Sequence, residues 1–199
     1  MKIFTVIISA IVAAFALFAF RFDNDQKQLV ISKDLIEFKT KNIIRCSPEW
    51  SELKDWLEEF DIPPIPGSGI YKWKISTKSD SAQFYFNQGI NMYYSFHIIE
   101  AMASFKKAAR FDESNAMLHW AQALTYGPNI NDYGYTASPE ALSASGKAIE
   151  FSSRNTEKEM ALIEAQRVRY SYDSSQTRAM LNQLYVDKMK EAYKKYPGD

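Results

Sequence analysis

The alternation of hydrophobic and polar positions predicts an all-α body preceded by an N-terminal apolar helix. Residues 3–20 carry no charge, so the chain opens on an apolar stretch of 18 residues. Further along, apolar side chains recur at helical spacing between capping serines and threonines, prolines and glycines. Short connections make most consecutive helices antiparallel neighbours. We expect helices over residues 48–60, 81–95, 98–110, 115–126, from 139 onward, 156–172 and 175–196.

Residues 1–20 have two interpretations, a retained membrane anchor and a cleaved signal peptide, and both remain open. Ala14-Phe15-Ala16 offers a small-x-small cleavage site, whereas the apolar run continues to Phe20, which favours an uncleaved anchor. Lys2 is the positive flank that stays on the cytoplasmic side. Either interpretation predicts a protein exported across or anchored in the cytoplasmic membrane, with its body on the extracytoplasmic side and its membrane contact through this segment.

Residues 21–69 are expected to form an N-terminal segment with a short amphipathic helix and a proline-rich connector. Ser47-Pro48 combines a capping serine with the position that favours proline at a helix start, so the helix should run from Pro48 to about Phe60. Three prolines and two glycines between residues 62 and 69 then interrupt helical structure. A stiff connector is favoured there over a ligand for an aromatic-lined groove.

Residues 82–115 form one unit of 34 residues with a distinctive set of small and aromatic positions. Gly89 lies in the middle of the first expected helix, and Ala101, Phe105 and Ala108 follow along the second. Gly89 and Ala101 allow the two helices to approach closely, whereas Phe105 fills the space between successive units and Ala108 makes room for the next helix. In its length and in these positions the unit resembles a tetratricopeptide repeat (TPR). The resemblance implies antiparallel helix pairs stacked as a short right-handed solenoid.

The resemblance extends loosely over the rest of residues 70–199, which we assign to one TPR-like helical domain. A second unit begins at Ala116, keeps Trp120 and Ala123 near the expected positions, and resumes after a loop at residues 127–139. The last two helices form a repeat-like pair. Because isolated pairs cannot cover their own hydrophobic faces, we expect the array to continue beyond Asp199, or the last helix to pack against a partner.

Since the first helices of successive TPR units line a concave surface that binds peptides, the resemblance implies a partner-binding groove. Six residues of the first helix share one face at spacings of i, i+3, i+4, i+7, i+10 and i+11, and two from the next unit extend it. These groove residues are Gln83, Phe86, Asn87, Ile90, Tyr93, Tyr94, Met117 and Trp120. The open alternative is that the aromatic side chains pack against neighbouring helices or the connector. The face carries no lysine or arginine, which argues against capture of a terminal carboxylate.

Composition and charge narrow the possible chemistry. Twenty-four basic residues balance 24 acidic ones, so a nucleic acid partner is not expected. One cysteine and two histidines leave few metal ligands, and no catalytic, cofactor or metal site is expected. His97, Glu100 and His119 are interpreted as structural residues rather than a metal or acid-base site. The loop at 129–140 has the spacing of a calcium-binding loop but too few carboxylates to bind calcium tightly.

Two functions remain. The favoured one is a protein-protein interaction scaffold of TPR type, not an enzyme, that binds a protein or peptide partner on the concave face. The alternative is an accessory helical region of an exported enzyme or metal-dependent protein whose chemistry lies downstream. The sequence leaves the identity of the partner and the oligomeric state open.

Overall fold

The computed structural model describes residues 48–129 and 135–197, and over these ranges the chain is all-helical. Within them it forms seven α-helices and a short 3-10 helix, Ser152–Arg154, and no strand. The α-helices are α2 (Trp50–Glu59), α3 (Asp80–Tyr94), α4 (Ile98–Phe111), α5 (Ala116–Tyr126), α6 (Pro139–Glu150), α7 (Glu157–Arg167) and α8 (Arg178–Lys195). The predicted all-α class is confirmed.

Chain contacts divide the protein into two units, residues 1–45 and residues 46–199. The segment expected to be a signal peptide or anchor, 1–20, lies outside the described residues, as do residues 130–134 of the loop considered for calcium. No helix in the described part of the chain has the length and apolar character that crossing a membrane requires.

Local capping signals account for most helix starts. Ser138 caps α6 with Pro139 in its first turn, and Thr156 forms the expected capping box with Glu159 at the start of α7. Two helix starts differ from the prediction. Helix α3 was expected from residue 81, but it begins at Asp80 after Ser79, whose side chain accepts the Ala82 N–H. Helix α2 begins at Trp50, two residues after Pro48, without a side-chain cap.

The expected extension of α7 to Tyr172 was also wrong, because the helix ends at Arg167. Tyr170 is buried beyond this end, with its hydroxyl 2.6 Å from the carbonyl oxygen of Gly127 and 2.6 Å from Gln166 Nε2. These contacts fix the chain against the end of α5.

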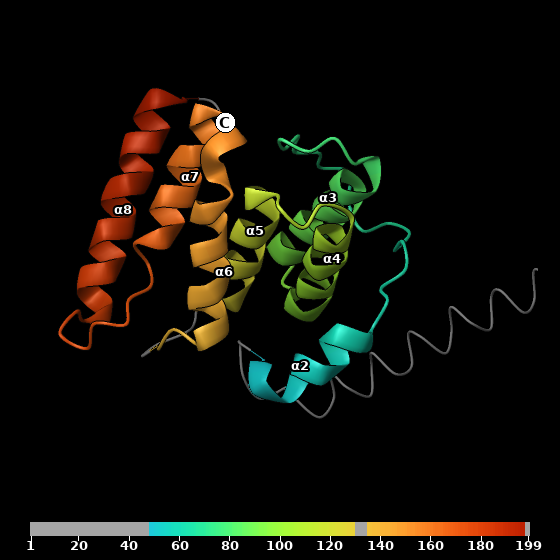
Figure 1. Cartoon of the computed structure of the whole chain (residues 1–199), viewed down its shortest axis with the longest axis horizontal. Coiled ribbons are helices and arrows are strands. Elements are labelled where there is room, and N and C mark those ends of the chain that lie inside the picture. The colour runs from blue at the N-terminus through green and yellow to red at the C-terminus, as the bar shows by residue number, and fades with distance from the viewer. Residues whose placement is uncertain (1–47, 130–134, 198–199) are drawn as a thin grey trace, which may run out of the picture. The chain divides into compact units, whose positions relative to one another are not determined.

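Consecutive helices pack against one another along the chain from α3 to α8 (Figure 1). In addition, α3 contacts α5 and α5 contacts α7, so these three helices form one layer. The core lies between this layer and its partners, where Ala101, Phe105 and Ala108 of α4 are fully buried.

A close approach of α3 and α4 explains the glycine in the middle of α3. A Cβ atom added at Gly89 would lie 2.6 Å from Cδ1 of Phe105, well inside van der Waals contact. The expectation that Gly89 permits a close helix approach is confirmed. The side chain that uses the space is Phe105, which packs its ring against Phe86 at a centroid distance of 5.8 Å.

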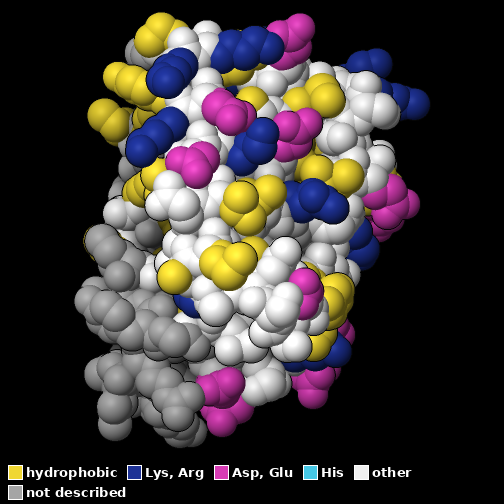
Figure 2. All heavy atoms as spheres, turned by 90° about the vertical axis from the view of Figure 1, so that its left-hand side faces the viewer, with side chains coloured by type: hydrophobic (Ala, Val, Ile, Leu, Met, Phe, Trp, Pro, Cys, Tyr) yellow, Lys and Arg dark blue, Asp and Glu magenta, His cyan; other side chains and the backbone are white. Residues whose placement is uncertain are grey.

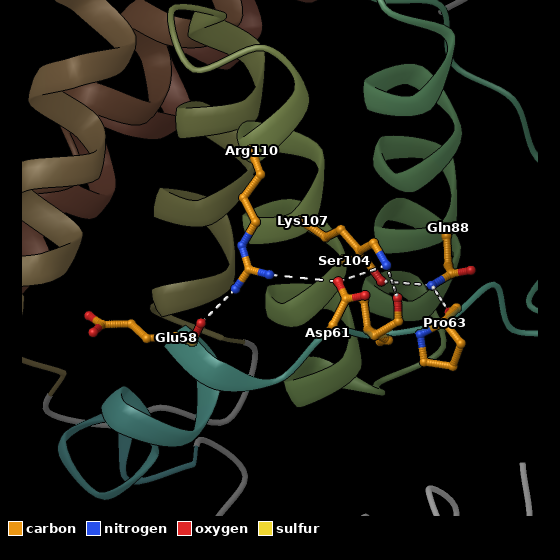
Figure 3. A network of polar contacts seen from close by, with 8 residues as sticks. Glu58, Asp61, Pro63, Gln88, Ser104, Lys107 and Arg110 are labelled. Atoms are coloured by element: carbon orange, nitrogen blue, oxygen red, sulfur yellow. Dashed lines mark hydrogen bonds and ion pairs between the residues drawn. The ribbon is translucent and has the colours of Figure 1, made fainter. Parts of the chain in front are cut away.

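Polar contacts connect α2 and the proline-rich connector to α3 and α4 (Figure 3). Arg110 donates to the carbonyl of Glu58 at 2.7 Å, and Lys107 pairs with Asp61 at 2.8 Å. From α3, the buried Gln88 accepts the Ile65 N–H at 2.8 Å. The connector is therefore packed on the helical unit through specific bonds.

Helix α8 has an exposed outer side. Only Leu181 and Ala192 of this helix are buried. Figure 2, which views the molecule from the α8 side, shows hydrophobic side chains interspersed with basic and acidic ones. Two exposed lysines of this helix, Lys188 and Lys195, pair with Glu191 and Glu157.

Candidate functional site

The face of α3 that was expected to form a partner-binding groove is occupied by the chain itself. Residues 71–75, called the bound segment below, lie in an extended conformation along this helix. Three amide side chains four residues apart bind its backbone. This amide row consists of Gln83, Asn87 and Asn91.

The amide row binds alternate residues of the segment in reverse order. Asn91 accepts the Tyr71 N–H at 3.2 Å and donates to the Tyr71 carbonyl at 2.8 Å. Asn87 accepts the Trp73 N–H at 3.0 Å, and Gln83 donates to the Trp73 carbonyl at 2.9 Å. A helix rises about 6 Å over four residues and an extended chain about 6.6 Å over two, so the two spacings match.

Side chains of the bound segment fill the space between the layer helices. Ile75 is buried, and its N–H donates to Gln83 at 3.0 Å. The Trp73 ring packs edge-on against Phe86 and Trp120, at centroid distances of 5.7 and 5.5 Å. The segment therefore joins α3 to α5 through an apolar contact as well as through its backbone.

Glu159 of α7 fixes the residue that follows the segment. Its carboxylate accepts the Ser76 N–H at 2.7 Å and also the Ser76 hydroxyl, while completing the capping box with Thr156. Burial alone would raise the Glu159 pKa, but the hydrogen bonds from Ser76 and Thr156 outweigh it, so the pKa lies below its ordinary value. The ionised carboxylate is thus the form that the structure stabilises.

A groove of about 830 Å³ lies beside the bound segment. One wall is residues 71–74 with the C-terminal part of α3, and the other comes from α7 and α8. The lining combines tyrosines, lysines and apolar side chains: Tyr71, Lys72, Trp73, Lys74, Ile90, Asn91, Tyr94, Ser95, Lys158, Leu162, Met189, Ala192, Tyr193 and Tyr196. No aspartate or glutamate is among these lining residues, so the charged side chains that line the groove are all lysines.

Two tyrosines present large accessible rings to the groove. Tyr94 is 67% exposed and Tyr193 is 66% exposed. Partial burial, together with the neighbouring phenols of Tyr185 and Tyr71, raises the pKa of Tyr94, so its hydroxyl stays protonated. Aromatic rings of this kind supply much of the contact area in protein recognition.

The sequence-predicted groove residues occupy four different environments. Gln83 and Asn87 bind the segment, and Tyr93 is half-buried with its hydroxyl 3.4 Å from Asn129. Ile90 and Tyr94 line the groove. The others are core side chains: Phe86, Met117 and Trp120, with the Trp120 indole N–H donating to the Leu162 carbonyl at 3.1 Å.

Several residues of the groove were not predicted, although a pattern in the sequence indicates them. Asn91 continues the four-residue spacing of Gln83 and Asn87. Residues 71–75 alternate between hydrophobic and lysine side chains, which is the period of an extended strand. The contribution of Lys158 and of α8 had no local signal, because it depends on how distant helices pack.

The histidines do not combine into one site. His97 lies 3.5 Å from Glu100 at the start of α4. His119 instead bonds the Glu113 carbonyl at 2.8 Å and packs against Phe151. Burial lowers the His119 pKa, so the ring is neutral near neutral pH. Within the ranges described, no group of three or more histidine, cysteine, aspartate or glutamate residues could hold a metal ion.

No protein-family model matches this sequence, and no match was found among curated proteins or among solved structures. What the chain binds is therefore inferred from the groove residues and their contacts.

Proposed function

We propose that this protein is an interaction scaffold of TPR type, whose groove binds an extended segment of a protein partner. In this proposal α3, α5 and α7 are the first helices of successive pairs and stack as a short right-handed solenoid. The layer formed by these three helices and the small residue at Gly89 support it. Residues 1–20 would export or anchor the protein, with the helical unit on the extracytoplasmic side of the cytoplasmic membrane.

The observation that carries the proposal is the amide row on α3. Gln83, Asn87 and Asn91 bind backbone N–H and C=O groups rather than side chains. A surface that binds the backbone of alternate residues suits an extended chain of many sequences. The protein's own segment supplies the first such chain, and the adjoining groove leaves room for a second.

The groove chemistry supports a binding role rather than catalysis. Its polar groups include the Asn91 amide, the Ser95 hydroxyl, phenols and lysines, and the rings of Tyr94 and Tyr193 are about two-thirds exposed. These groups provide contact area and hydrogen bonds, which are the usual means of partner recognition.

The proposal can be tested by photo-cross-linking in cells that express the full chain. A photoreactive phenylalanine analogue replaces Tyr94 or Tyr193 in the groove, or Tyr172 as the control. Tyr172 is 81% exposed and does not line the groove. We expect one discrete partner adduct from both groove positions and none from the control. Identical adducts from all three positions, or none from the groove positions, would contradict the proposal.

A further inference from the structure

The bound segment has one backbone edge that the amide row does not use. In an extended chain, N–H and C=O groups of successive residues point to opposite edges. Tyr71 and Trp73 direct both groups to α3, and Ile75 directs its N–H there. The backbone groups of Lys72 and Lys74 therefore point to the opposite edge. No group among the described residues bonds to them.

This open edge adjoins the groove. Lys72 and Lys74 line the groove together with Leu162 of α7 and with Met189 and Tyr193 of α8. The groove, with its volume of about 830 Å³, thus separates the edge from the helices on the other side. An additional extended chain placed there would meet the edge directly, as strands do when they add to a sheet.

The charge of the groove favours an acidic occupant. Lys72 and Lys74 are two residues apart and exposed, so both side chains lie on the same face of the segment. No aspartate or glutamate is among the residues that line the groove. Alternate acidic side chains on a paired strand would match the spacing of the two segment lysines.

We propose that the groove binds an acidic, extended segment of a protein partner as an added strand paired with Lys72 and Lys74. The partner's carboxylates lie near Lys72 and Lys74, and its intervening apolar side chains contact Tyr94 and Tyr193. This inference rests on the proposed function and specifies the chemistry of the partner. It also separates two roles: the amide row holds the chain's own segment, and the open edge recognises the partner.

Binding of synthetic peptides to the full chain tests the inference by fluorescence anisotropy. The probe is a short labelled peptide of alternating Glu and Val, and its charge control has Lys in place of Glu. We expect the Glu peptide to bind at least about tenfold more tightly, with affinity falling as salt rises. Equal binding of the two peptides would overturn the inference.

Backbone pairing is tested separately by N-methylation of the Glu-Val peptide at every second residue. Only one edge of a paired strand bonds its neighbour. Methylation in one register should therefore weaken binding about tenfold, whereas methylation in the other register should leave it unchanged. If neither register matters, the peptide does not pair as a strand and the inference fails.

Two charge-reversal variants locate the site. Lys72→Glu with Lys74→Glu should weaken binding of the Glu-Val peptide by about tenfold. The control, Lys54→Glu with Lys147→Glu, makes the same change in net charge at exposed positions outside the groove and should bind as the wild type does. Equal losses in both variants would contradict the assignment. Helical circular dichroism establishes that each variant is folded.

The peptide and cross-linking experiments can fail independently. If Tyr94 and Tyr193 cross-link a partner but the Glu-Val peptide does not bind, the inference is overturned and the scaffold function stands. If the peptide binds in the predicted register but no partner cross-links, the groove chemistry is supported and the proposed cellular role fails.

Discussion

Replacing Gly89 by alanine should destabilise the protein, whereas the same replacement at Gly146 should stabilise it. Both glycines lie inside helices, in α3 and α6. A Cβ atom at Gly89 would lie 2.6 Å from Cδ1 and 2.8 Å from Cζ of Phe105. A Cβ atom at Gly146 would have nothing within 4 Å. The two positions therefore share one chemical change and differ in the space available for it.

The change in the free energy of unfolding at Gly89 is the sum of two opposing contributions. Alanine in place of glycine in a helix interior contributes about 1 kcal/mol of stability at either position. Overpacking a buried contact costs about 1–3 kcal/mol, and the Phe105 ring that the new methyl group would meet is fully buried beside Phe86. Gly146→Ala should therefore stabilise by about 1 kcal/mol, and the two variants should differ by about 1–3 kcal/mol.

Urea unfolding of the full chain, followed by helical circular dichroism, measures both free energies of unfolding. A third variant combines Gly89→Ala with Phe105→Leu, which removes the ring atoms that the new methyl group would contact. In that background Gly89→Ala should no longer be destabilising. If Gly89→Ala stabilises the wild type as much as Gly146→Ala does, the close approach of α3 and α4 is refuted.

The remaining predictions concern the bound segment and two titrating side chains. Asn87→Ala removes the acceptor of the Trp73 N–H, so a protease should cleave residues 71–75 faster in this variant. We expect a rate at least about fivefold higher than in the control Asn182→Ala, which changes an exposed asparagine. Equal rates would show that Asn87 does not hold the segment in place. The Glu159 pKa is lowered below 4.5, so its contribution is present above that value and is lost as pH falls through the folded-state pKa. Glu159→Gln should therefore lower the free energy of unfolding by about 1–3 kcal/mol near neutral pH and by much less at about pH 3, and a cost independent of pH would contradict this. Because burial lowers the His119 pKa below 6.5, protonation favours the unfolded state, and stability falls as pH drops through 6.5 and below. His119→Gln should flatten this dependence in urea unfolding between about pH 7 and pH 5, and an unchanged slope would count against it.

The helices themselves were largely predictable, because their signals are local. Thr156 and Glu159 specify a helix start within four residues, and Ser138-Pro139 does the same for α6. The end of α7 was not predictable, since it depends on Tyr170 reaching Gly127 more than 40 residues away in sequence. Local sequence therefore predicted helix starts better than it predicted a helix end that depends on long-range packing.

The candidate site was predictable only in part. Gln83 and Asn87 were identified on one helical face, but their occupant could not be, because the pairing with residues 71–75 joins a helix to an extended segment. Trp120 shows the same limit. An aromatic ring at helical spacing can contact a partner or the protein's own core. Here the Trp120 ring packs against Trp73 of the bound segment, so it belongs to the core.

The short tether of the bound segment has a consequence for competition at the amide row. Residues 76–79 connect the segment directly to the start of α3. A chain tethered so closely is present at an effective concentration of about millimolar or higher at its own binding surface. A free peptide with equal intrinsic affinity would have to exceed that concentration to displace the segment. Partners at cellular abundance would therefore find the amide row already occupied by the bound segment.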